Sequence, residues 1–173
     1  KVINAIQKLT LRVQNVEEIM NASITGEQYV QTFDDLYDVE YSGNSERNTK
    51  LKPGVFEYLK SLHEKGVKMS FATASERVVC EGTLKKHGIF DFFDTFAYVS
   101  EINIGKTEPD IYLLAAERMG VTPEDCIVFE DILEGICGAK KGNFTVCGVY
   151  DKSSAEDTDK IKQVADYYIK SFE

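Results

Sequence analysis

The chain has 173 residues, of which 43% are hydrophobic and 28% charged, and this balance predicts one globular domain, or one domain with a small insert. Its formal net charge of −9 argues against non-specific binding to nucleic acid, which requires a basic surface. No apolar run approaches the length of a membrane span, and no secretory signal is visible, so we expect a cytoplasmic protein that binds neither nucleic acid nor membrane.

The cysteines support the same compartment. None forms a C-x-x-C pair, and all lie in apolar segments, which predicts buried reduced thiols rather than disulfides or a zinc site. They are Cys80, Cys126, Cys137 and Cys147.

Residues before about 50 read as helices alone. Apolar residues recur at steps of three and four from Val2 to Met20 and give one apolar stripe. A second helix is expected to start at Thr25, with Gln28 completing a capping box and an apolar face that continues through residues 30, 33 and 37. The polar residues 42–50 are expected to form a turn-rich connector.

From Leu51 onward, strand and helix patterns alternate. Expected strands cover residues 67–73, 95–99, 126–129, 144–150 and 166–169, and expected helices cover 52–66, 76–88, 109–120, 133–142 and 156–165. The strands are continuous apolar runs rather than alternating ones, so both of their faces should be buried. This pattern predicts an α/β fold with a parallel sheet.

Several polar side chains follow the expected strands. Ligands of parallel sheets bind at the carboxyl ends of the strands, where loops lead into helix N-termini. Thr73 and Ala74 follow one strand, Lys106 precedes the helix at Pro109, and the pair Glu130 and Asp131 follows another strand. A hydroxyl, backbone N–H groups and a lysine suit phosphoryl oxygens, and carboxylates suit Mg²⁺, so the set predicts phosphate chemistry.

Each of these residues also has a plain structural reading. Ser75 is more often the N-cap of a helix, and a loop lysine such as Lys106 is usually solvated. The two acids could simply favour the N-terminus of the next helix. The combination, with each feature after a different strand, favours the functional reading.

The chain resembles the haloacid dehalogenase superfamily, in the branch of small phosphatases and β-phosphoglucomutase-like proteins with a helical cap. The matching stretches are "LKPGVFEYLKSLHEKGVKMSFATAS", "GKTEPDIYLLAAERMGV" and "EDCIVFEDILEGICGAKKG". The resemblance implies a three-layer Rossmann-like parallel sheet over residues 49–173, with residues 1–48 as part of an all-helical cap.

The same resemblance implies roles for individual residues. Thr73 would be the phosphate-binding hydroxyl, and Ala74 would contribute its backbone N–H. Lys106 would stabilise the phosphoryl group and the charge of the nucleophile. Asp131 would bind the Mg²⁺ cofactor, with Glu130 as its supporting carboxylate.

The sequence also departs from the family pattern. The family nucleophile is an aspartate in a D-x-D-G-T-like motif after the first strand, and no such motif is present. The acids of "TFDDLYD", which are Asp34, Asp35 and Asp38, are rejected because they fall in an expected helix with no strand before them. We therefore expect an N-terminally incomplete chain that lacks the central strand, which would lie between residues 67–73 and 126–129. Two smaller departures concern single positions. Thr107 stands where the family commonly has proline after the lysine, and Ile132 stands where a small polar residue usually follows the acid pair.

The expected function is a Mg²⁺-dependent hydrolase or phosphotransferase that acts on a small phosphorylated metabolite through a phosphoaspartyl intermediate. A sugar phosphate or a phosphoglycolate-type substrate fits the resemblance. Two alternatives stay open: a non-catalytic protein of the same fold that binds a phosphorylated ligand or a partner, and a phosphoacceptor receiver domain. The receiver domain is less favoured, because its acidic pair would precede the threonine and the lysine. Neither substrate identity nor oligomeric state can be read from the sequence.

Overall fold

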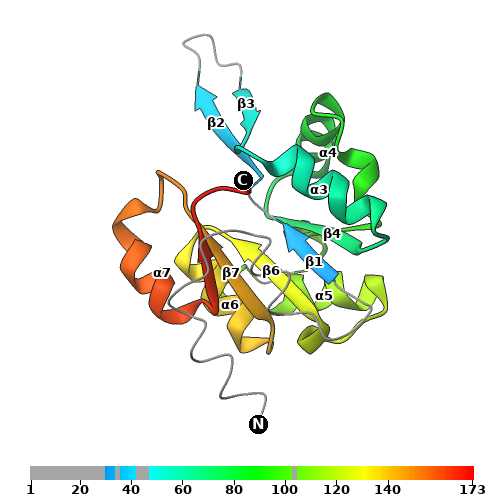
Figure 1. The fold of residues 1–173 in the computed structure, drawn as a ribbon. Helices are drawn as coiled ribbons and strands as arrows, with labels where there is room; N and C mark the ends of the chain where they lie inside the picture. Colours follow the sequence, from blue (N-terminus) through cyan, green and yellow to red (C-terminus); the bar gives the residue numbers. More distant parts are fainter. Residues whose placement is uncertain (1–29, 34–35, 42–46, 103–104) are drawn as a thin grey trace.

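A six-stranded sheet forms the centre of the molecule in the computed structural model, which describes residues 30–33, 36–41, 47–102 and 105–173. The strands lie in the order β5-β4-β1-β6-β7-β8, and each neighbouring pair is parallel (Figure 1). Their bounds are β1 Val30–Phe33, β4 Lys68–Thr73, β5 Thr95–Tyr98, β6 Cys126–Glu130, β7 Thr145–Val149 and β8 Tyr167–Ile169. The predicted α/β fold with a parallel sheet is confirmed.

Strand β1 corrects the helix expected over this part of the chain. Val30–Phe33 pairs with β4 on one side and with β6 on the other, so it fills the central position that we expected to be empty. The three-to-four spacing of apolar residues favoured a helix. In the sheet, β1 forms backbone hydrogen bonds with both neighbouring strands. Each backbone N–H or C=O group left buried and unpaired would otherwise cost about 1–3 kcal/mol.

Helices cover both faces of the sheet. Helices α3 (Val55–Glu64) and α4 (Arg77–Lys86) pack on one face, and α5 (Asp110–Met119), α6 (Leu133–Lys141) and α7 (Thr158–Val164) pack on the other. Short 3₁₀ turns occupy Phe90–Phe92, Val99–Glu101, Pro123–Asp125 and Ala155–Asp157. The helices predicted after residue 51 are thus confirmed.

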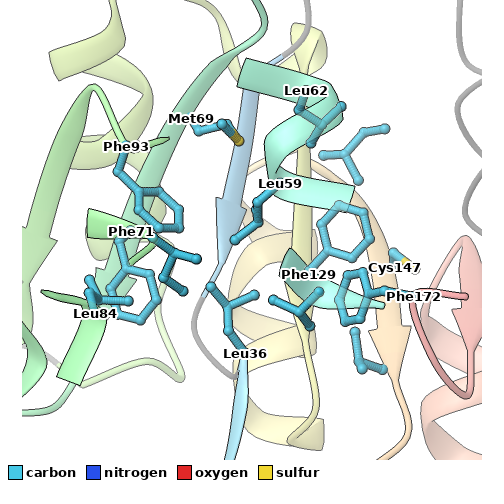
Figure 2. Close-up of a cluster of buried hydrophobic side chains, with 14 of the residues drawn as sticks. Leu36, Leu59, Leu62, Met69, Phe71, Leu84, Phe93, Phe129, Cys147 and Phe172 are labelled. Atoms are coloured by element: carbon cyan, nitrogen blue, oxygen red, sulfur yellow. The ribbon is translucent and has the colours of Figure 1, made fainter. Parts of the chain in front are cut away.

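Alternate residues of β4 and β6 enter different cores, which explains the continuous apolar runs of these strands in the sequence. Phe71 and Phe129 belong to the cluster under α3 and α4, where they lie near Leu59 (Figure 2). Ala72 and Val128 belong to the opposite cluster, under α5 and α6. The sheet is therefore buried on both sides, as a parallel sheet requires.

A second, two-stranded sheet follows β1 in the chain. Strands β2 (Tyr37–Tyr41) and β3 (Arg47–Leu51) pair antiparallel and form a hairpin that projects beyond the central sheet (Figure 1). The helix expected up to this point is therefore wrong for residues 37 and 38, and the connector expected over 42–50 is wrong for residues 47–50. The all-helical cap expected over 1–48 is therefore wrong for the strand residues 30–33, 37–41 and 47–48, whereas residues 1–29 lie outside the described residues, where the cap stays a prediction.

Within the described ranges, no helix combines the length and the apolar character needed to cross a bilayer.

Candidate active site

The acidic pair at the end of β6 is buried. Glu130 is the last residue of the strand, Asp131 follows it, and their exposed fractions are 1% and 4%. This burial shows that the two carboxylates do not lie in a solvated loop. A buried carboxylate needs charged or hydrogen-bonding partners, because desolvation strongly disfavours an isolated charge.

Glu130 has partners on both carboxylate oxygens. Its Oε2 accepts hydrogen bonds from Nζ of Lys106 at 3.3 Å and from the hydroxyl of Tyr112 at 2.9 Å. Its Oε1 accepts the backbone N–H groups of Asp131 at 3.2 Å and Ile132 at 3.4 Å. Four donors from three segments of the chain therefore meet at one carboxylate, and together they fill its usual acceptor capacity.

The Lys106 side chain is a buried ion-pair partner rather than a solvated lysine. Only 10% of the side chain is exposed, and it forms a salt bridge with Glu130. The loop that carries it is held against α6, where Nζ of Lys141 donates to the carbonyl oxygen of Thr107 at 2.8 Å. Lys106 is thus placed by the start of α5 and by α6 together.

Two glycines of α6 make this arrangement sterically possible. A Cβ atom at Gly135 would lie 2.5 Å from Cδ of Glu130, and one at Gly138 would lie 2.0 Å from the carbonyl oxygen of Lys106. Both distances are far shorter than a van der Waals contact. The glycines therefore allow the carboxylate and the lysine loop to approach the helix.

Thr73 ends β4 and is buried, with 3% of its surface exposed. Its Oγ1 accepts the backbone N–H of Ser75 at 3.0 Å, so the chain turns tightly after the strand. Helix α4 takes Glu76 rather than Ser75 as its N-cap. Among the described residues, Ala74, Ser75, Glu76 and Val79 line a hollow of about 590 Å³ beside this turn.

Register places Thr73 and Asp131 at the same level of the sheet. Phe33 of β1 pairs with Phe71 of β4 and with Phe129 of β6. Thr73 lies two residues beyond Phe71, and Asp131 lies two residues beyond Phe129. The two residues therefore flank the line of β1, with their strands separated by two strand spacings, or about 10 Å.

The acids that follow β1 are rejected as nucleophiles from the sequence partly because no strand is expected before them. That reason is wrong, because β1 ends at Phe33, directly before Asp34. Asp34 and Asp35 themselves lie outside the described residues. The absence of Gly-Thr after them still holds.

The donor set near β6 suits a hard divalent cation without enclosing it. Mg²⁺ commonly takes one or two carboxylates and completes its shell with water and phosphate oxygens. Within the described part of the chain, no group of three His, Cys, Asp or Glu side chains is placed to hold a metal ion. Asp131 fits as a ligand in such an open site, whereas Glu130 would join it only by giving up a hydrogen bond.

Tyr112 is the site residue that sequence reasoning missed. It lies on the buried face of α5, has an exposed fraction of 0%, and bonds to Glu130. A fully buried tyrosine needs a hydrogen-bond partner for its hydroxyl. The sequence offered one indication that Tyr112 belongs to the site, which is its position six residues after Lys106. Ile132, noted as a departure, occupies the N-cap of α6 and makes no side-chain cap hydrogen bond.

A parallel α/β sheet with Thr73, Lys106 and a buried acid pair near its carboxyl edge defines a Rossmann-like protein with a candidate phosphate site. Residues 4–143 match the family model described as haloacid dehalogenase-like hydrolase. The chain belongs to this family, and the resemblance inferred from the sequence is confirmed.

Individual relatives agree with the family assignment. A phosphorylated carbohydrates phosphatase of Thermotoga maritima is 35% identical over 53% of this chain, and the match covers 42% of that protein. A fructose-1-phosphate phosphatase of Escherichia coli is 39% identical over 42% of this chain, and the match covers 38% of that protein. The chain thus spans less than half the length of these two relatives.

A solved structure agrees as well. The crystal structure of β-phosphoglucomutase from Clostridium difficile is similar with a TM-score of 0.61 and 27% identity. The match covers 70% of this chain and 51% of that one.

Proposed function

We propose that this protein is a Mg²⁺-dependent phosphatase or phosphoglucomutase-like phosphotransferase that acts on a small phosphorylated metabolite of the sugar phosphate or phosphoglycolate type. The observation that supports it best is the buried Lys106–Glu130 salt bridge beside Asp131, at the strand end where such folds bind ligands. The phosphatase relatives support the substrate class.

Each residue has a role in this proposal. The hydroxyl of Thr73 and the backbone N–H of Ala74 bind the non-transferred phosphoryl oxygens. Lys106 supplies positive charge to the same oxygens as charge develops during transfer. Glu130 keeps Lys106 oriented and, through the two backbone N–H groups it accepts, holds the turn at Asp131.

Asp131 would hold the metal ion, with Glu130 as its supporting carboxylate. When bound, Mg²⁺ would neutralise negative charge on the phosphoryl oxygens. The nucleophile is proposed to be an aspartate that forms a phosphoaspartyl intermediate.

Asp131→Asn tests the metal assignment in the natural full-length protein. We expect turnover to fall at least about 100-fold, because loss even of a residue that only supports a metal ligand typically costs about 10–100-fold in metal affinity or activity. Phosphate release from a panel of sugar phosphates, phosphoglycolate and nucleotides is the measurement, with Mg²⁺ affinity from calorimetry. Asp125→Asn is the matched control, because Asp125 precedes the same strand at its opposite end and bonds to Thr122.

Normal Mg²⁺-dependent activity in Asp131→Asn would refute the metal assignment. Lys106→Ala should also lower turnover by orders of magnitude, while Lys60→Ala, which removes an exposed lysine, should not. Asp34→Asn tests for the nucleophile directly after β1: an inactive variant that no longer forms a protein-bound phosphate would place the nucleophile at this position.

A further inference from the structure

The hydroxyl of Tyr112 shares one carboxylate oxygen with the proposed catalytic lysine. Tyr112 Oη and Lys106 Nζ both donate to Oε2 of Glu130, at 2.9 and 3.3 Å. The tyrosine contact is the shorter of the two, and both of its partners are buried. The position of this oxygen is therefore set from two sides, by α5 and by the loop before it.

The Tyr112 ring is anchored independently of its hydroxyl. It packs edge to face on Phe144, with ring centroids 6.2 Å apart, and it belongs to the core between α5 and α6. The ring thus fixes where the hydroxyl lies, and the hydroxyl fixes the carboxylate. A rigid donor on a helix holds a geometry better than a donor on a loop.

We propose that Tyr112 is a positioning residue, which orients Lys106 toward the phosphoryl group by holding Glu130 Oε2. This inference rests on the proposed phosphatase function. Because Tyr112 acts through Glu130, its hydroxyl should matter only while the carboxylate is present. Its loss should lower kcat more than it raises KM, since the charge on Lys106 acts mainly in the transition state.

Tyr112→Phe in the natural full-length protein tests the proposal, because it removes the hydroxyl and keeps the ring. We expect kcat to fall about tenfold and KM to change less than about twofold, the size expected for one lost hydrogen bond to a charged group. Tyr168→Phe is the matched control. The Tyr168 hydroxyl bonds to Thr158, and the residue lies on β8, an edge strand two strands away from β6. Its kcat should stay unchanged.

A double-mutant cycle separates positioning from packing. Tyr112→Phe combined with Glu130→Gln should be no slower than Glu130→Gln alone. Additive losses would overturn the proposal, and so would an unchanged kcat in the single variant. A midpoint of thermal unfolding within a few degrees of the parent value shows that each variant keeps the fold.

A readout that needs no turnover distinguishes this proposal from the proposed function. Trinitrobenzenesulfonate modifies lysine amines, and peptide mass spectrometry reports the rate at Lys106. We expect that rate to rise at least about threefold in Tyr112→Phe, with the rate at Lys60 unchanged. An unchanged rate at Lys106 would overturn the positioning role. If the parent protein hydrolyses no substrate, but Lys106 is labelled faster in Tyr112→Phe than in the parent, the phosphatase function is overturned and the positioning role is supported.

Discussion

Gly135 shows how a residue without a side chain determines the geometry of the site. Its hydrogen faces the carboxylate of Glu130, in space that a methyl group would need. Because four donors hold that carboxylate, it has little freedom to move aside. Gly82, on α4, offers a direct comparison, since nothing lies within 4 Å of a Cβ atom placed there.

Gly135→Ala should destabilise the protein by about 1–3 kcal/mol, as overpacking a tight interior does, and should lower turnover by moving Glu130. Gly82→Ala should instead stabilise it by about 0.5–1 kcal/mol, because alanine loses less backbone entropy in a helix. Urea unfolding and phosphate release measure the two effects. Equal stability changes in the two variants would contradict the steric argument.

At the scale of elements, a buried ion pair connects the segment between β3 and α3 to the end of β7. Lys52, with 5% exposed, forms a salt bridge with Asp151, and its Nζ also donates to the carbonyl oxygen of Tyr150 at 3.3 Å. Burial raises the pKa of Asp151, but hydrogen bonds from Lys52 and Ser153 outweigh it, so the net pKa is lowered. The ionised carboxylate is thus favoured by folding.

Asp151→Asn should lower the free energy of unfolding by about 1–3 kcal/mol at pH 7, because it removes a negative charge that pairs with the buried Lys52 ammonium. A lowered pKa in the folded state contributes stability above the unfolded pKa, about 3.9, and this stability is lost as pH falls through the folded value. The difference between parent and variant should therefore shrink below about pH 4.

Asp157→Asn is the control for that comparison, since Asp157 pairs with Lys160 in an exposed position. Its effect should stay under about 1 kcal/mol. Denaturant unfolding at pH 7 and at pH 3 measures the change in the free energy of unfolding for Asp151→Asn and for Asp157→Asn. A difference at Asp151 that persists undiminished at pH 3 would exclude the ion pair as its source.

At the scale of the whole molecule, the sheet depends on β1, because this strand joins the β4–β5 half to the β6–β7–β8 half. Because β4 and β6 both pair with β1 in matching register, Thr73 and Asp131 lie at the same level of the sheet. The hairpin β2–β3 stands apart from this sheet (Figure 1). A two-stranded ribbon is only marginally stable by itself.

Amide hydrogen exchange tests this topology in the chain. The amides of Val30–Phe33 that bond within the sheet should exchange as slowly as those of β4 and β6, because a central strand opens only with the global unfolding of its domain. Amides of β2 and β3 should exchange faster. Exchange of the β1 amides at the rate of an unstructured peptide would contradict the central placement.

The sequence alone determined the parallel α/β core after residue 51 and the identity of the buried edge residues Lys106, Glu130 and Asp131. These features rest on local signals: continuous apolar strands, glycine and proline at helix ends, and polar residues directly after strands. Such signals act over a few residues, so one sequence suffices to read them.

Only the tertiary structure decided the state of Val30–Phe33 and the contact between Tyr112 and Glu130. A short apolar segment fits a helix or a strand, and here the pairing needs of β4 and β6 favour the strand. Tyr112 and Glu130 lie 18 residues apart, and their contact exists only because α5 packs beside β6. Contacts of this kind depend on how elements pack, and local patterning carries no record of that packing.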